Sequence, residues 1–219
     1  MDDESLSRLV AVTGPAGSSN VALAAAVASV RNAAPGSRAV ILVEGISDRN
    51  AIEALAVRHG RNLSREGVFV VPMGGATNIG HFLDLFGPRG LSARLAGLCD
   101  EAEEGDFRRG LARAGFGPVA ARPDLERLGF YVCVADLEDE LIRSLGTAAV
   151  EQVIASQGEL TGFRTFCQQP AQRTRPREQQ LRRFMGTRSG RKARYARLLT
   201  TALDPTQVPA PLNRVLSHL

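Results

Sequence analysis

The stretch from residue 38 to 56 constrains the fold more than any other part of this sequence. Five apolar residues (39–43) are followed by Glu44 and a glycine, and helical spacing begins shortly afterwards. A continuous aliphatic run is typical of a strand buried on both faces of a parallel sheet. Ser47 is the predicted N-cap of the next helix, 48–58. We therefore expect Glu44 at the carboxyl end of a strand, the edge where open α/β sheets place their ligands.

The same alternation of strand and helix recurs along the first two thirds of the chain. Further apolar runs predict strands over 68–73, 94–99 and 129–134, each followed by helical spacing. Four such units in succession predict an α/β fold, with a mainly parallel four-stranded sheet flanked by helices. The helices predicted between and after these strands are 78–86 with Thr77 as its N-cap, one that ends near 114, and 138–145.

The strand pattern ends after residue 146, whereas helical spacing continues. The predicted helices of this region are 148–155, 177–185, 191–203 and 212–216, with a loop over 168–176. Near the N-terminus, 23–30 predicts one packing helix. We accordingly divide the chain into an N-terminal helical segment (1–36), an α/β core (37–146) and a basic helical C-terminal extension (147–219).

Composition argues against several classes of protein. The three cysteines have no metal-binding spacing, and their odd number argues against a disulfide framework, so we expect a reducing, cytoplasmic location. The chain begins with acidic residues where a signal peptide is basic, and the apolar run 22–30 is too short to span a bilayer. The stretch 14–19 has the glycines of a phosphate-binding loop but not its Gly-Lys-Ser/Thr ending, so we expect no nucleotide site there.

Charge is unevenly distributed along the chain. Between 98 and 140 eleven acidic residues stand against five arginines, and between 164 and 197 eleven basic residues stand against one acid. An acidic centre followed by a basic region suits a metal site beside a surface that binds a polyanion. The plainer alternative is an Arg-rich solvated surface from a high-GC genome. Lys192, the single lysine of the chain, is an exception to that alternative.

Acidic residues follow three of the four predicted strands. Glu44 follows the first strand, Asp100 the third and Asp136 the fourth. Because parallel strands end at one edge of the sheet, we expect these carboxylates to converge, and they repel one another unless cations lie among them. Oxygen ligands suit Mg²⁺ or Mn²⁺. Two such ions about 3.5–4 Å apart are a common device for phosphodiester chemistry.

Each acid also has a plainer structural interpretation. Asp48 and the run 138–140 lie in first helical turns, where the helix dipole favours any carboxylate. The run 101–104 resembles an ordinary acidic helix start. Glu44 is harder to explain in this way, because a carboxylate between an apolar strand and a glycine is half-buried and needs a partner. Asp100 has the same placement after the third strand.

The residues 43–48 (Val-Glu-Gly-Ile-Ser-Asp), followed by a helix, resemble the opening motif of Toprim domains, which have a Rossmann-like sheet. More narrowly, 38–216 resembles the Toprim half of the OLD-family (overcoming lysogenization defect) nucleases. The resemblance implies a catalytic role for Lys192, which lies in the later helical region. It also implies metal ligands, which map to Glu44, Asp48, Asp100 and Glu138, with Glu103 and Asp136 as further candidates.

Two features depart from the family pattern. Toprim domains usually carry Asp-x-Asp after the third strand, but here Ala102 occupies the second aspartate position. Glu103, and less readily Glu101, is the candidate to reach the same ion through its longer side chain. OLD-family proteins also join this domain to an ATPase. Because this chain has no credible Walker motif, we expect a stand-alone Toprim protein or one that works with a separate ATPase.

The leading hypothesis is metal-dependent hydrolysis of a nucleic-acid phosphodiester with one or two Mg²⁺ or Mn²⁺ ions. DNA is the favoured substrate. Glu44 is a candidate ligand or general base. Lys192 is the candidate to neutralise charge on the phosphate or to protonate the leaving oxygen. Arginines of the basic region are expected to bind backbone phosphates without reading sequence, namely Arg173, Arg175, Arg182, Arg183, Arg188, Arg191 and Arg194.

Three alternatives stay open on the sequence. The first is a non-catalytic nucleic-acid-binding or recombination module, which the Ala102 departure favours. The second is a small-molecule phosphohydrolase or nucleotidyl transferase, and the third is a regulatory subunit for a separate ATPase. A homodimer is a further candidate assembly.

Overall fold

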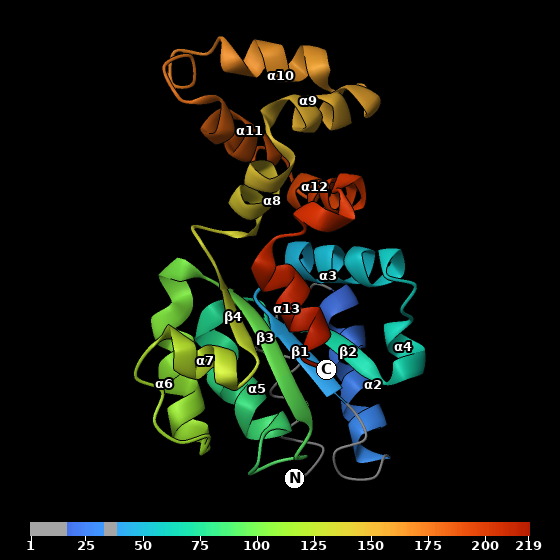
Figure 1. The fold of residues 1–219 in the computed structure, drawn as a ribbon, viewed down its shortest axis with the longest axis vertical. Coiled ribbons are helices and arrows are strands. Elements are labelled where there is room, and N and C mark those ends of the chain that lie inside the picture. The colour runs from blue at the N-terminus through green and yellow to red at the C-terminus, as the bar shows by residue number, and fades with distance from the viewer. Residues whose placement is uncertain (1–16, 33–38) are drawn as a thin grey trace.

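The sheet of this computed structural model, which describes residues 17–32 and 39–219, contains four parallel strands (Figure 1). In sequence order they are β1 (Ala39–Val43), β2 (Val68–Pro72), β3 (Arg94–Asp100) and β4 (Phe130–Cys133). Their spatial order is β2-β1-β3-β4, so β1 lies inside the sheet and pairs with both β2 and β3. The predicted four-stranded parallel α/β fold is confirmed.

Helices cover both faces of the sheet and form the whole C-terminal region (Figure 1). The helical elements are α2 (Gly17–Arg31), α3 (Ile46–Arg58), α4 (Leu63–Glu66), η1 (Ala76–Asn78), α5 (Ile79–Phe86), η2 (Glu101–Glu103), α6 (Glu104–Ala114), α7 (Arg122–Arg127), α8 (Leu137–Leu145), α9 (Thr147–Ser156), α10 (Leu160–Cys167), α11 (Arg177–Met185), α12 (Arg191–Ala202), η3 (Pro205–Gln207) and α13 (Ala210–Ser217). The short helices α4, α7 and α10 were not expected from the sequence.

Alternate residues of each strand enter two separate hydrophobic cores. Ile41 and Val43 face one core with α3, α8, α12 and α13, whereas Val40 and Leu42 face the other with α2, α5 and α6. All of β1 is buried, as its continuous aliphatic sequence predicts for a strand covered on both faces.

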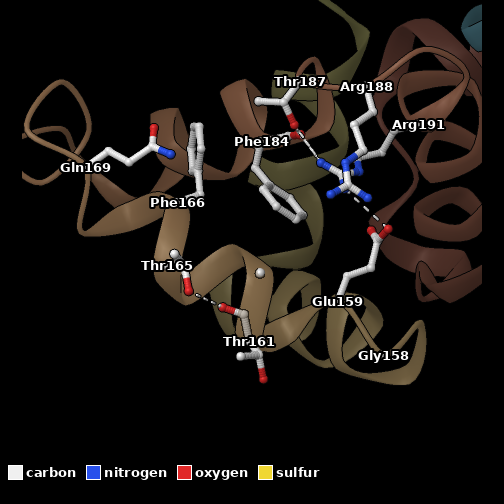
Figure 2. Close-up of a pocket in the computed structure, with 11 residues that line it drawn as sticks. Gly158, Glu159, Thr161, Thr165, Phe166, Gln169, Phe184, Thr187, Arg188 and Arg191 are labelled. Atoms are coloured by element: carbon white, nitrogen blue, oxygen red, sulfur yellow. Dashed lines mark hydrogen bonds and ion pairs between the residues drawn. The ribbon is translucent and has the colours of Figure 1, made fainter.

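The C-terminal helices leave the sheet and then return to it. Helices α8 to α11 form an arm that extends away from the sheet, and α12 then packs against α3 and α8 (Figure 1). A cavity of about 590 Å³ lies in the arm, between α10 and the turn that joins α11 to α12 (Figure 2). The return of α12 brings the basic region next to the carboxyl edge of the sheet.

Two predicted helix caps are wrong. Helix α3 begins at Ile46, one residue before Ser47, and Gly45 occupies the N-cap position. The Gly45 N–H donates to Asp48 Oδ2 at 2.8 Å, so a carboxylate inside the first turn replaces the hydroxyl cap. Thr77 lies within the 3₁₀ turn η1, and Asn78 occupies the N-cap position of α5.

Two sequence features near the N-terminus have different outcomes. Residues 14–16 of the stretch 14–19 lie outside the described residues, as do 1–16 and 33–36 of the predicted segment 1–36. The predicted packing helix 23–30 lies within α2. Among helices of the described ranges, none has the length and apolar character needed to cross a membrane.

The lack of a side chain at Gly97 in β3 makes room for the ring of Phe130 in the neighbouring strand β4. A Cβ at this position would lie 2.4 Å from Phe130 Cδ1 and 3.0 Å from the Leu42 carbonyl oxygen. Because Phe130 is fully buried, its ring has no free space into which it could move.

We therefore expect Gly97→Ala to lower the free energy of unfolding by about 1–3 kcal/mol, the usual cost of overpacking a core. For a chain of this size each kcal/mol corresponds to a loss of roughly 2–4 °C in Tm, measured by thermal unfolding. Gly80→Ala is the control, because a Cβ at that helical glycine meets no atom within 4 Å. Equal melting temperatures for the two variants would contradict the packing argument.

Candidate metal centre

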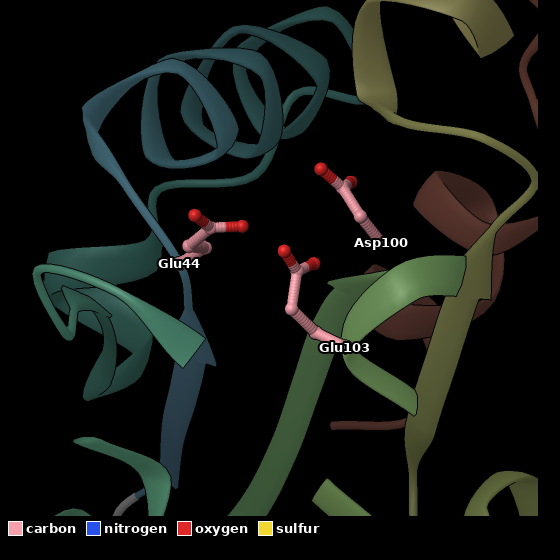
Figure 3. A group of neighbouring side chains, drawn as sticks. All are labelled: Glu44, Asp100 and Glu103. Carbon is pink, nitrogen blue, oxygen red and sulfur yellow. The ribbon is translucent and has the colours of Figure 1, made fainter. Parts of the chain in front are cut away.

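Three carboxylate side chains meet at the carboxyl edge of the sheet. Glu44 follows β1, Asp100 ends β3, and Glu103 ends the turn η2 that follows β3. One oxygen atom of each lies within 4.8 Å of the others, and Figure 3 shows the three side chains pointing toward one another. The structure thus brings Glu103 next to Glu44, beside the position where Ala102 offers no carboxylate.

The loop after β2 fixes the backbone of Glu44. The N–H groups of Gly74 and Gly75 donate to the Glu44 carbonyl oxygen at 3.0 and 3.2 Å. Both glycines have positive φ values, 74° and 130°, a region that favours glycine. The Gly-Gly pair directly after the second predicted strand was the sequence signal for this role, which sequence reasoning missed.

Burial and repulsion from neighbouring acids disfavour the charged forms of Asp100 and Glu103. Burial, followed by the charges of Asp48 and Asp136, raises the pKa of Asp100 to about 8. Burial and the neighbouring Glu44 likewise raise the pKa of Glu103. Glu103 Oε2 is buried without a hydrogen-bond donor. Within the described part of the chain none of the three acids forms an ion pair. Three half-buried carboxylates of this kind, with no His or Cys among them, are a donor set that fits Mg²⁺ or Mn²⁺.

Asp48 lies next to this group but has a structural partner of its own. It is buried in the first turn of α3, where its Oδ2 accepts the Gly45 N–H. Burial raises its pKa to about 7, the Gly45 hydrogen bond opposes this rise, and the Glu138 carboxylate adds to it. Asp48 therefore adds negative charge to the edge and also starts α3.

The acids that follow β4 are paired with cations. Asp136 occupies the N-cap of α8, where Oδ1 accepts the Asp139 N–H at 2.9 Å and Oδ2 accepts Nε–H of Arg182 at 2.6 Å. Glu138 is 1% exposed, and its Oε2 lies 3.0 Å from Nζ of Lys192. This contact is an ion pair by distance only, because neither Glu138 oxygen receives an aligned hydrogen bond.

The side chain of Lys192 lies next to Glu138 at the carboxyl edge of the sheet, and not on a basic outer surface of α12. It lies in the first turn of α12, the helix that packs against α3 and α8. Burial alone would lower the pKa of its ammonium group, but the carboxylates of Glu138, Asp48 and Asp136 outweigh that effect and raise it. Lys192 therefore stays protonated and offers a fixed positive charge beside the carboxyl edge.

The predicted phosphate-binding arginines do not form one surface. Arg175, Arg182 and Arg183 line a cavity of about 680 Å³ together with Lys192, Asp136 and Glu138. Others have different surroundings. Arg173 is exposed, Arg188 lines the cavity of the arm, Arg194 pairs with Glu159, and Arg191 is buried and donates to the Phe184 carbonyl and Thr187.

The remaining acids near the strand ends have structural partners. Arg122 binds both Glu101 and Glu104, at 2.9 and 2.7 Å, which leaves Glu103 as the acid of that run beside Glu44. Glu140 accepts the Val134 N–H at 2.8 Å at the end of β4. Sequence reasoning did not anticipate Arg122, because it lies in an unpredicted helix, α7, about twenty residues from its partners.

Without a bound cation, the raised pKa of Asp100 makes stability depend on pH. The folded protein retains this proton up to about pH 8, whereas the unfolded chain loses it near 3.8, so its stabilising contribution is lost as pH rises between these values. We expect the Tm difference between Asp100→Asn and wild type, measured in EDTA, to be roughly 2–4 °C more positive at about pH 9 than at about pH 5.

The control is Glu53→Gln on the outer side of α3, which should show no such pH-dependent difference. Added Mn²⁺ at the higher pH should raise the Tm of the wild type and raise that of Asp100→Asn less. A pH-independent difference between Asp100→Asn and wild type would argue against a buried, protonated Asp100.

Comparisons with known proteins agree with this geometry. A family model described as "Overcoming lysogenization defect protein-like, TOPRIM domain" matches residues 37–101, which include Glu44, Asp48 and Asp100. No curated protein sequence matches the chain significantly.

Solved structures share the fold over most of the chain. The C-terminal region of the Xanthomonas campestris pv. campestris OLD protein is 26% identical with a TM-score of 0.65, over 83% of this chain and 93% of that chain. The C-terminal region of the Burkholderia pseudomallei OLD protein is 24% identical with a TM-score of 0.58, over 83% and 96% of the two chains. Because the sequence match and the shared fold coincide on the same sheet, this chain contains a Toprim domain of the OLD family.

Proposed function

We propose that this protein hydrolyses phosphodiester bonds in nucleic acid, in the first place DNA, with the help of one or two divalent cations. One observation carries the proposal: Glu44, Asp100 and Glu103 converge without an ion-pair partner among the described residues, next to a cavity whose lining includes Arg175, Arg183 and Lys192. The converging acids supply an attraction for cations, and the basic cavity supplies one for phosphates. Both lie at the sheet edge where α/β folds bind their ligands.

The three converging carboxylates are the proposed ligands of a first Mg²⁺ or Mn²⁺ ion. A bound ion of this kind supplies an activated water and stabilises charge on the leaving oxygen. Asp48 is a further proposed ligand, since its raised pKa marks it as an acid without a full counter-charge. Glu44 is alternatively the general base, since its carboxylate converges with those of Asp100 and Glu103 (Figure 3).

A role for Asp136 and Glu138 as ligands of a second ion depends on an exchange of partners. In the free protein Arg182 and Lys192 hold these two carboxylates. An incoming phosphate competes for the same cations, because Arg and Lys bind phosphate as well as carboxylate. Substrate binding therefore frees the acids when it engages the cations.

Lys192 is the proposed electrostatic partner of the reacting phosphate. It is protonated and half-exposed beside the acids, so its ammonium can bind a non-bridging oxygen or donate a proton to the leaving oxygen. Arg175 and Arg183 line the same cavity and are the proposed contacts to neighbouring phosphates. A separate ATPase, a homodimer and a cytoplasmic location stay predictions from the sequence.

Nicking of supercoiled plasmid with Mn²⁺ or Mg²⁺ tests the proposal. Glu44→Gln keeps the shape of the side chain but removes its charge, and we expect a rate loss of about 10²–10³-fold, in the range for removal of one strong electrostatic contact. Glu53→Gln, a matched change outside the site, should nick like wild type. The catalytic proposal is lost if Glu44→Gln and wild type nick at the same metal-dependent rate.

Lys192 variants test the electrostatic role separately from folding. Lys192→Met should reduce kcat for nicking by at least about tenfold, whereas Lys192→Arg should recover part of it because the positive charge is kept. Thermal unfolding of both variants shows whether the fold survives. Equal activity of Lys192→Met and wild type would assign Lys192 to the Glu138 ion pair alone.

A second candidate is a nucleic-acid-binding module without catalysis. Two observations favour it. Asp136 pairs with Arg182 and Glu138 pairs with Lys192, and Ala102 occupies the position of the second aspartate. It predicts salt-sensitive DNA binding, as expected when Arg and Lys neutralise phosphates, with no nicking by wild type under any divalent cation.

A further inference from the structure

The helical arm contains a second cavity that the proposed chemistry does not use. Its volume is about 590 Å³, within the range of roughly 300–1,000 Å³ typical of small-ligand sites. Its walls come from α10, from Phe184 of α11 and from the turn and first residue of α12 (Figure 2). The turn 186–190 separates it from the basic cavity beside the acids, because Gly186 lines one cavity and Thr187 the other.

A glycine inside a helix leaves part of this cavity open. Gly162 lies in the first turn of α10, and a Cβ built on it meets no atom within 4 Å. Glycine weakens a helix relative to alanine, so a helical glycine normally has a packing reason within the chain. No close packing requires glycine at this position, and Gly162 is one of the residues that line the cavity.

Cations and aromatic rings face this cavity. The side chain of Arg188 is exposed and has no ion pair or hydrogen bond among the described residues, and the buried Arg191 stacks on Phe184 at 4.2 Å with its Nε unsatisfied. Phe166 is partly exposed, with its ring tilted against that of Phe184 at 5.7 Å. The one acid of the lining, Glu159, is already bound by Tyr195, Arg194 and Arg191.

We propose that this cavity binds one nucleotide of a single-stranded nucleic acid, with the base against Phe166 and the phosphate on Arg188. The proposal rests on the proposed function, because it places a second contact of the same substrate on the arm. Unpaired bases stack on exposed aromatic rings without regard to sequence, and an Arg without a protein partner is free to bind the backbone. A duplex cannot present an unstacked base to such a cavity, so the substrate class is single-stranded or frayed nucleic acid.

Fluorescence anisotropy of the full chain tests the assignment. The probe is a labelled mixed-sequence oligodeoxynucleotide, either single-stranded or annealed to its complement, with Ca²⁺ in place of Mg²⁺. Gly162→Leu fills the cavity, and we expect it to weaken single-strand binding by roughly five- to hundredfold, the range for loss of one base–aromatic stack. Duplex binding should be unchanged. Arg188→Gln should lower the slope of log affinity against log salt by about 0.7 for the single strand.

The matched control is Gly80→Leu, since Gly80 also lies in the first turn of an eight-residue helix, α5, with nothing within 4 Å of its Cβ. It should bind both forms like wild type, and both leucine variants should keep or raise the Tm. Unchanged single-strand binding by Gly162→Leu, or an equal loss for the duplex, overturns the cavity assignment while nucleic-acid binding stands. Wild type that binds neither form overturns the proposed function as well.

Discussion

The repulsion among carboxylates at one edge of the sheet is the constraint on which the rest of this structure depends. Parallel pairing brings the ends of β1 and β3 together, and the elements that follow them add further acids. Part of this charge is compensated from within the chain, since α12 returns to the sheet and presents Lys192 to Glu138. Glu44, Asp100 and Glu103 have no ion-pair partner among the residues that the structure describes, and burial together with the neighbouring acids raises the pKa values of Asp100 and Glu103.

The sequence predicted the sheet and the convergence of acids because both follow from local rules. Aliphatic runs identify buried strands, and parallel strands end at one edge, so Glu44 and Asp100 had to lie near each other. The pairing of Glu138 with Lys192 could not be derived in the same way. It depends on how α12 packs against α8 and α3, contacts between segments far apart in the chain that leave no local pattern. The wrong cap at Ser47 has a local origin, because α3 begins at Ile46 and the Asp48 carboxylate accepts the N–H of Gly45, which occupies the N-cap position.

The helical arm also contains an element and a cavity that the sequence did not predict. Helix α10 was not expected from the sequence, whereas α5, which has the same length and also carries a glycine in its first turn, was predicted. The glycine of α10, Gly162, lines the cavity of the arm. One short turn, 186–190, separates that cavity from the basic one.

Because every other Lys/Arg position of this sequence is an arginine, the single lysine can be modified selectively. Lys192 carries the only side-chain primary amine in the sequence, and this amine lies half-exposed beside Glu138. Reductive methylation or an isotope-labelled acyl group therefore modifies a single side chain, and that side chain lies at the centre of the site. The fraction of an amine in its reactive, unprotonated form falls as its ammonium is stabilised, so the rate of labelling at a given pH reports whether the carboxylate still holds it. Labelling of this one amine therefore reports, chemically and by spectroscopy, on the ion pairing at the carboxyl edge of the sheet.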